Sequence, residues 1–231
     1  MSVEARIVGA HVLDVRERIV SSCSRSGRNP DDVVLVAVTK YATLAQTQSA
    51  IEAGCGVLGE ARWPDYAEKI ERFGKQVIWH FIGHLQTNKV KYAIDDFQVI
   101  HSLDRLSLAK ELSRQAELKG KTLDVFIQVN VSGEDSKFGL VPADVAGFVQ
   151  SVFDFPGLRP IGLMTMAPLT DDPEMARPHF RALRELRDQL NNMLPQERFL
   201  PGLSMGMSND FEVAIEEGAT HVRVGSGLFG E

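Results

Sequence analysis

The chain has 231 residues, of which 44% are hydrophobic and 24% charged, and its 25 Lys and Arg against 31 Asp and Glu give a formal net charge of −6. This composition is typical of a soluble globular protein and excludes a disordered, collagen-like or coiled-coil chain. Because nucleic acids and anionic membranes are bound through basic surfaces, the negative charge argues against both as partners.

The first residues and the two cysteines indicate where the protein works. Charged residues such as Glu4 and Arg6 interrupt the apolar positions of segment 1–20, which therefore does not resemble a signal peptide. No apolar run approaches the ~18 residues that a membrane span requires. Cys23 and Cys55 lie far apart without a CxxC or zinc-ligand spacing, which is typical of reduced, buried thiols. We therefore expect a cytoplasmic protein.

Apolar periodicity predicts an N-terminal helix followed by alternating strands and helices. In residues 4–24, apolar side chains recur every three or four positions, as on one face of an amphipathic helix. The valine-rich segment 33–40 is typical of a strand buried in a parallel sheet. Further strands are predicted at residues 56–60, 77–83, 97–103, 123–131, 158–166, 203–207 and 221–230. Helices are predicted at residues 44–53, 62–73, 84–94, 104–119 (with Asp104 as N-cap), 143–154, 174–193 and 210–217.

Eight predicted strands, each but the last followed by a helix, favour one closed (β/α)8 barrel of the TIM type. Alternating units of this kind form parallel sheets through right-handed crossovers. No GxGxxG follows the first strand, which argues against a dinucleotide-binding sheet. We expect a single domain over residues 1–231, with the helix and linker of residues 1–30 packed on the barrel in place of the missing last helix.

The first strand ends in Lys40, and the active site of such barrels lies at this end of the strands. A lysine that is desolvated there has a lowered pKa, so its neutral amine is available to form a Schiff base. The alternative interpretation is a lysine that only extends from the strand end into solvent.

The last two strands carry the residues of a predicted phosphate site. Ser208 follows the seventh strand, and Gly225 and Ser226 follow the eighth. Phosphate sites in these barrels are frequently built from these two loops, because glycines let the backbone N–H groups approach the anion. An ordinary turn that closes the barrel is the alternative. Together with a Schiff-base lysine, a phosphate site suggests pyridoxal 5′-phosphate, which carries both an aldehyde and a phosphate.

Arg223 is predicted to point inward from the eighth strand, between these two anchors. An arginine there can donate to the pyridine nitrogen of the cofactor and keep that nitrogen unprotonated, which weakens the cofactor as an electron sink. Alternatively, Arg223 pairs with Glu60 or another carboxylate at the rim.

Three histidines could be drawn as a metal site together with Glu60. They are His80, His84 and His101, but the sequence contains no HxH or HExxH spacing. We predict no metal site and interpret these histidines as residues of the rim or the core.

Several segments resemble the pyridoxal phosphate homeostasis family, and the match runs from about residue 5 to the end of the chain. The most specific are HFIGHLQTNK and SMGMSND. The resemblance rests on residues 36–40, 80–89, 101–104, 129–140, 162–168 and 203–230.

The resemblance implies an alanine-racemase-like barrel of fold-type III that carries pyridoxal 5′-phosphate on Lys40. By the same reasoning Arg223 would face the pyridine nitrogen, and His84 and Asn130 match motif positions of the family. The phosphate would be held by Ser208, Gly225 and Ser226. Members of the family are associated with vitamin B6 and amino-acid homeostasis and generally lack a convincing catalytic activity.

The sequence departs from the family at Ala61, where the family usually has an asparagine. We expect a carrier or buffer of the cofactor rather than a catalyst, with apo forms of cofactor-dependent enzymes as recipients, and a monomer, since racemases of this fold add a C-terminal domain. One alternative is a racemase or lyase that uses Lys40 and His84 as bases. Another is a Schiff-base aldolase that binds a phosphorylated sugar directly.

Overall fold

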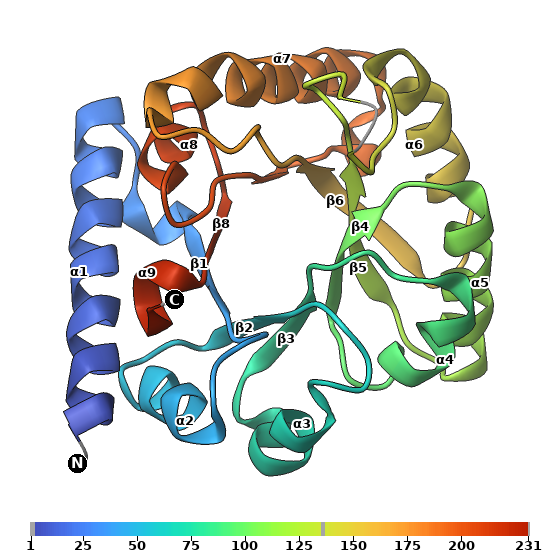
Figure 1. Cartoon of the computed structure of the whole chain (residues 1–231). Helices are drawn as coiled ribbons and strands as arrows, with labels where there is room; N and C mark the ends of the chain where they lie inside the picture. The colour runs from blue at the N-terminus through green and yellow to red at the C-terminus, as the bar shows by residue number, and fades with distance from the viewer. Residues whose placement is uncertain (1–2, 135–136, 231) are drawn as a thin grey trace.

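The computed structural model describes residues 3–134 and 137–230, with side chains from residue 6 onward. Within these residues, eight parallel strands form a closed barrel in sequence order (Figure 1). The strands are β1 Val34–Val38, β2 Val57–Glu60, β3 Ile78–Phe81, β4 Val99–Leu103, β5 Leu123–Gln128, β6 Leu158–Met164, β7 Gly202–Ser204 and β8 His221–Val224. The predicted (β/α)8 barrel is confirmed.

The first and last strands close the barrel by pairing in parallel. Val34 lies opposite His221, and Val36 lies opposite Arg223. Because side chains alternate between the two faces of a strand, His221 and Arg223 point to the same face of β8. The segments that follow β1 and β8 therefore meet at one edge of the barrel.

Helices connect the strands around the outside, as predicted. They are α1 Val3–Ser26, α2 Leu44–Glu52, α3 Ala67–Phe73, α4 Val90–Ala93, α5 Leu106–Leu118, α6 Val145–Phe153, α7 Arg177–Met193, α8 Phe211–Glu216 and α9 Ser226–Phe229. Two differences concern the ends of elements. The helix expected at 84–94 is only the 3-10 turn Thr87–Lys89 and the short α4, and β8 ends at Val224 so that α9 forms from residues expected to extend it.

The prediction that Asp104 caps α5 is wrong. The N-cap position is Arg105, and its side chain makes no capping hydrogen bond. The Asp104 carboxylate instead accepts a hydrogen bond of 2.6 Å from Arg105 Nη1. A neighbouring guanidinium is a stronger partner for a carboxylate than a backbone N–H group.

Helix α1 packs on the outside of the barrel, as the apolar spacing predicts. Its buried apolar residues are Val8, Val12, Val15, Ile19 and Cys23, and the helix packs on α2, α8 and α9 (Figure 1). Two ion pairs, Arg18–Glu212 at 3.1 Å and Arg25–Glu216 at 2.8 Å, join α1 to α8. No helix in the described part of the chain is long and apolar enough to span a membrane.

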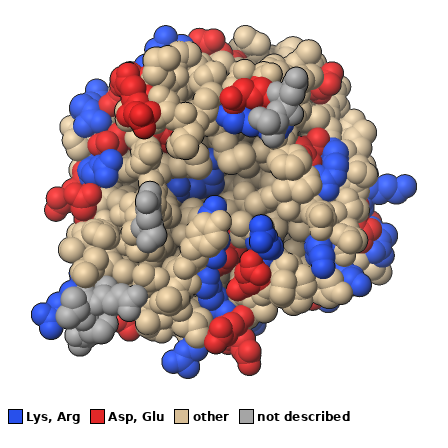
Figure 2. Space-filling model, viewed as in Figure 1, with Lys and Arg blue, Asp and Glu red and all other residues tan. Residues whose placement is uncertain are grey.

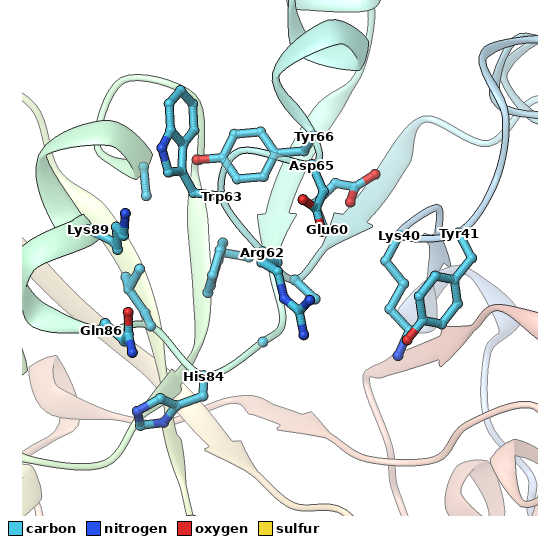
Figure 3. A pocket seen from close by; sticks show the side chains of 15 residues that line it. Lys40, Tyr41, Glu60, Arg62, Trp63, Asp65, Tyr66, His84, Gln86 and Lys89 are labelled. Carbon is cyan, nitrogen blue, oxygen red and sulfur yellow. The ribbon is translucent and has the colours of Figure 1, made fainter.

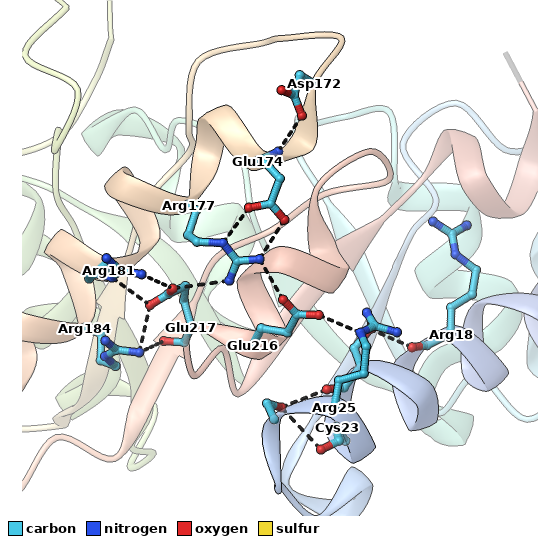
Figure 4. A network of polar contacts seen from close by, with 12 residues as sticks. Arg18, Cys23, Arg25, Asp172, Glu174, Arg177, Arg181, Arg184, Glu216 and Glu217 are labelled. Atoms are coloured by element: carbon cyan, nitrogen blue, oxygen red, sulfur yellow. Dashed lines mark hydrogen bonds and ion pairs between the residues drawn. The ribbon is translucent and has the colours of Figure 1, made fainter.

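A network of ion pairs also joins α7 to the end of α8 (Figure 4). The buried Glu217 accepts from Arg177, Arg181 and Arg184 at 2.8–3.3 Å. Burial alone would raise the pKa of Glu217, but these guanidinium groups hold that pKa below its ordinary value. This carboxylate therefore stays charged and fixes the segment that precedes β8.

Candidate functional site

A cavity of about 800 Å³ opens where the strands end. The space-filling view shows a hollow at the centre of this face, with Lys and Arg side chains at its floor and rim (Figure 2). Six of the seven predicted site residues line the cavity: Lys40, His84, Ser208, Arg223, Gly225 and Ser226.

Lys40 lies two residues beyond the end of β1, at the mouth of the cavity. Its side chain is exposed, with Nζ 4.9 Å from the centre of the Tyr41 ring. The preceding Thr39 is buried and donates a hydrogen bond of 2.6 Å to Glu60 Oε1. This contact ties the end of β1 to the end of β2 and fixes the position from which the lysine extends. The amine itself is not desolvated.

The loops after β7 and β8 meet at Ser208. Its Oγ accepts hydrogen bonds from the backbone N–H groups of Gly225, at 3.2 Å, and Gly227, at 3.1 Å. A Cβ on Gly225 would lie only 3.3 Å from the Cβ of Val38, so this position has little room for a side chain. Because it accepts from both N–H groups, the Ser208 hydroxyl can donate its own hydrogen to a ligand, and with Ser226 in the same lining it forms a donor set of the kind that holds a phosphate. The residues present therefore fit a phosphate group.

Arg223 lies in the barrel interior, at the floor of the cavity, and is only 4% exposed. Its guanidinium donates to Ser204 Oγ at 2.6 Å and to the carbonyl oxygen of Thr165 at 3.0 Å. Burial lowers the pKa of Arg223 to about 10, so the group remains protonated at neutral pH. The alternative that Arg223 pairs with Glu60 is wrong, because Glu60 pairs with Lys69 at 2.9 Å.

Of the two remaining predicted site residues, His84 lines the larger cavity and Asn130 does not. The exposed His84 stacks on Phe138, with ring centres 4.1 Å apart. Asn130 is not among the residues that line the cavity. Its side chain donates to the Glu134 carbonyl at 2.9 Å and accepts from the Gly133 N–H at 3.1 Å, so it shapes its own loop.

Comparisons with known proteins agree with this arrangement. The sequence model described as "Alanine racemase, N-terminal domain" matches residues 20–231. The chain is 44% identical over 218 residues to the pyridoxal phosphate homeostasis protein of Aquifex aeolicus, covering 94% of this chain and 95% of that protein. It is 40% identical over 230 residues to the protein of the same name from Pseudomonas aeruginosa, covering 96% and 95%. This chain belongs to the pyridoxal phosphate homeostasis family.

Solved structures of similar proteins share the fold of this family member. A protein of unknown function from Bifidobacterium adolescentis has a TM-score of 0.91 at 34% identity, covering 99% of this chain and 97% of its own. PipY of Synechococcus elongatus, solved with pyridoxal phosphate bound, has a TM-score of 0.81 at 33% identity, covering 94% and 100%. Alanine racemase of Corynebacterium glutamicum, at 15% identity and a TM-score of 0.72, shares the fold alone and extends beyond it, since only 62% of that chain is covered.

The sequence analysis did not predict a chain of buried polar side chains beneath Arg223. Because Arg223 can only donate, the Ser204 hydroxyl is free to donate to His101 Nδ1, 2.8 Å away. His101 Nε2 then donates to His80 Nδ1 at 2.9 Å. Burial lowers the pKa of His80 to about 3 and holds that of His101 well below its ordinary value, so both rings are neutral. In the sequence, the only indication of this hydrogen-bonded series was the position of His80 within β3 and of His101 within β4.

A smaller cavity of about 470 Å³ adjoins the first (Figure 3). The two cavities share Lys40, Tyr41, Ala61, Gly83 and His84. Ala61, the position at which we expected a departure from the family pattern, thus lies in the common wall. In Figure 3 the side chain of Arg62 extends between Lys40 and His84.

Proposed function

We propose that this protein binds pyridoxal 5′-phosphate as a Schiff base on Lys40 and serves intracellular homeostasis of this cofactor as a carrier or buffer. The observation that carries the proposal is one cavity of about 800 Å³ whose lining includes the Lys40 amine, the Arg223 guanidinium and the loop of Gly225 and Ser226. The family membership and the bound cofactor in the PipY structure support it.

Each group of the cavity has a distinct task in this proposal. When bound, the cofactor supplies an aldehyde that condenses with a primary amine, with loss of water. Lys40 is that amine, the hydroxyls of Ser208 and Ser226 hold the phosphate, and Gly225, which has no side chain, leaves room for the anion. The protonated Arg223 orients the pyridine ring by donating to its nitrogen.

Two features favour a carrier over a catalyst. An arginine donor leaves the pyridine nitrogen unprotonated, which makes the cofactor a weaker electron sink. In addition, Lys40 is exposed, so the linked cofactor can be reached by an acceptor protein. We propose apo forms of cofactor-dependent enzymes as the recipients, and a monomer with one domain over residues 1–231 that works in the cytoplasm. His84 is proposed to contact the cofactor at the entrance of the cavity, and Asn130 to act only through the loop that it holds.

Absorbance of the purified protein tests the proposal. We expect a band near ~420 nm, general for Schiff bases of this cofactor, that borohydride reduction fixes on the peptide containing Lys40. A colourless protein that takes up no added cofactor would overturn the proposal and favour a Schiff-base aldolase. Deuterium exchange at the Cα of amino acids, measured against the cofactor alone, distinguishes a carrier from a racemase or lyase.

A further inference from the structure

We propose that the smaller cavity beside Lys40 is a binding site for a free α-amino acid with a large apolar or aromatic side chain. The cavity is lined from the ends of β2 and β3, the segments that follow them, and Lys40 and Tyr41 after β1, and its contacts with such a ligand need no cofactor.

The first observation is a buried carboxylate oxygen without a partner. Glu60 is fully buried and lines the cavity. Its Oε1 accepts from Thr39 Oγ1 at 2.6 Å and Lys69 Nζ at 2.9 Å. Its Oε2 has no hydrogen-bond partner among the described residues. A buried carboxylate oxygen left in this state is costly, so a donor that enters the cavity is stabilised there.

The second observation is a pair of cations in the lining of the same cavity. Arg62 and Lys89 line the cavity, and within the described part of the chain neither lies within ion-pair distance of a carboxylate. A purely anionic ligand would suit these two side chains but would leave Glu60 Oε2 without a donor. Asp65 also lines the cavity, but a purely cationic ligand would meet the three cations Arg62, Lys89 and Lys40 against two carboxylates, of which Glu60 is already paired with Lys69. A zwitterion, with its ammonium toward Glu60 and its carboxylate toward Arg62, satisfies both.

The rest of the lining fits the side chain of the ligand. The volume of about 470 Å³ lies in the range of small-molecule sites and exceeds the needs of glycine. Trp63 stacks on Tyr92, with ring centres 4.8 Å apart, and contacts Tyr66 edge-on at 5.7 Å, which gives a firm aromatic wall. The apolar part of the lining includes Trp63, Tyr66, Phe81, Leu85 and Ala93.

Calorimetric titration of the cofactor-free, full-length protein with L-phenylalanine tests the proposal. Three probes each lack one recognised part: phenethylamine lacks the carboxylate, 3-phenylpropanoate lacks the ammonium, and glycine lacks the side chain. We expect L-phenylalanine to bind and each of the three to bind at least ten-fold more weakly. No binding of L-phenylalanine, or equal binding of phenethylamine, overturns the proposal.

Arg62→Ala locates the site, because Arg62 lines the smaller cavity but not the larger one. Arg62 is exposed and has no ion-pair partner among the described residues, so its removal leaves the fold intact. We expect at least a ten-fold loss of affinity for L-phenylalanine. Lys91→Ala, an exposed cation over the Tyr92 ring, is the matched control and retains the affinity. Unchanged binding by Arg62→Ala, or an equal loss in both variants, contradicts the proposal. The absorbance of the cofactor-loaded protein tests the proposed function separately.

Discussion

Arg223 Nη1 lies 2.6 Å from Ser204 Oγ, and this contact connects the floor of the larger cavity to neutral histidines in the barrel interior. In this series of hydrogen bonds, the Ser204 hydroxyl accepts from Arg223 and can donate to His101. The orientation of the guanidinium therefore depends on a hydroxyl that never faces the cavity mouth.

Ser204→Ala should lower the free energy of unfolding by about 1–3 kcal/mol, because it leaves buried polar groups on Arg223 and His101 without a partner. Urea unfolding followed by circular dichroism measures the change. Ser107→Ala, at an exposed position of α5, is the control and should change stability by less than about 0.5 kcal/mol. Equal stability of the two variants would show that the hydroxyl has no such role.

Acid should destabilise the protein before its carboxylates titrate. Burial lowers the pKa of His80 to about 3 and of His221 to about 4, whereas both titrate near pH 6.5 in the unfolded chain. Below pH 6.5 the unfolded state therefore binds more protons, and stability falls by up to about 1.4 kcal/mol per pH unit for each histidine. Urea unfolding between pH 7.5 and 5 tests this, and a constant free energy would contradict it.

Lys40→Ala should abolish the absorbance band of the linked cofactor and lower its retention during dialysis at least ten-fold, because the covalent link is lost. Lys91→Ala is the control, since that lysine lies outside both cavities. A band that survives dialysis in Lys40→Ala would assign the linkage to another amine.

Ser208→Ala should weaken binding of pyridoxal 5′-phosphate about ten- to hundred-fold, since a hydrogen bond to a charged group such as this phosphate is worth about 1.5–3 kcal/mol. Binding of pyridoxal, which lacks the phosphate, is the internal control and should not change. Fluorescence titration of both compounds measures the difference. An equal loss for both would place Ser208 away from the phosphate.

Gly206→Ala should destabilise the loop that carries Ser208. Gly206 has a φ of +90°, and a Cβ there would lie 2.6 Å from the Cβ of Ala214. Gly147→Ala, in α6 with open space around it, is the matched control and should stabilise the protein by about 0.5–1 kcal/mol. Melting temperatures of the two variants should shift in opposite directions, and a shared direction would refute this reading of the loop.

The sequence predicts this fold well because each βα unit carries its own signal. The valine-rich β1 and the apolar face of α1 are local patterns, and both elements form as expected. Asn130 and Asp104 were harder, since a short polar side chain can bond to its own loop or to a neighbour equally well, and the outcome depends on contacts that spacing does not encode. The His80–His101 contact joins different strands, so only the closed barrel reveals it.

Helix α1 covers the outside of the barrel where the first strand, β1, pairs with the last strand, β8. It packs on α2, which follows β1, and on α8 and α9, which flank β8. The Lys40 amine and the N–H groups of Gly225 and Gly227 belong to these same first and last units. We therefore expect detachment of α1 to change the spacing between Lys40 and the loop of Gly225 and Gly227, so that loss of this helix lowers both stability and cofactor retention.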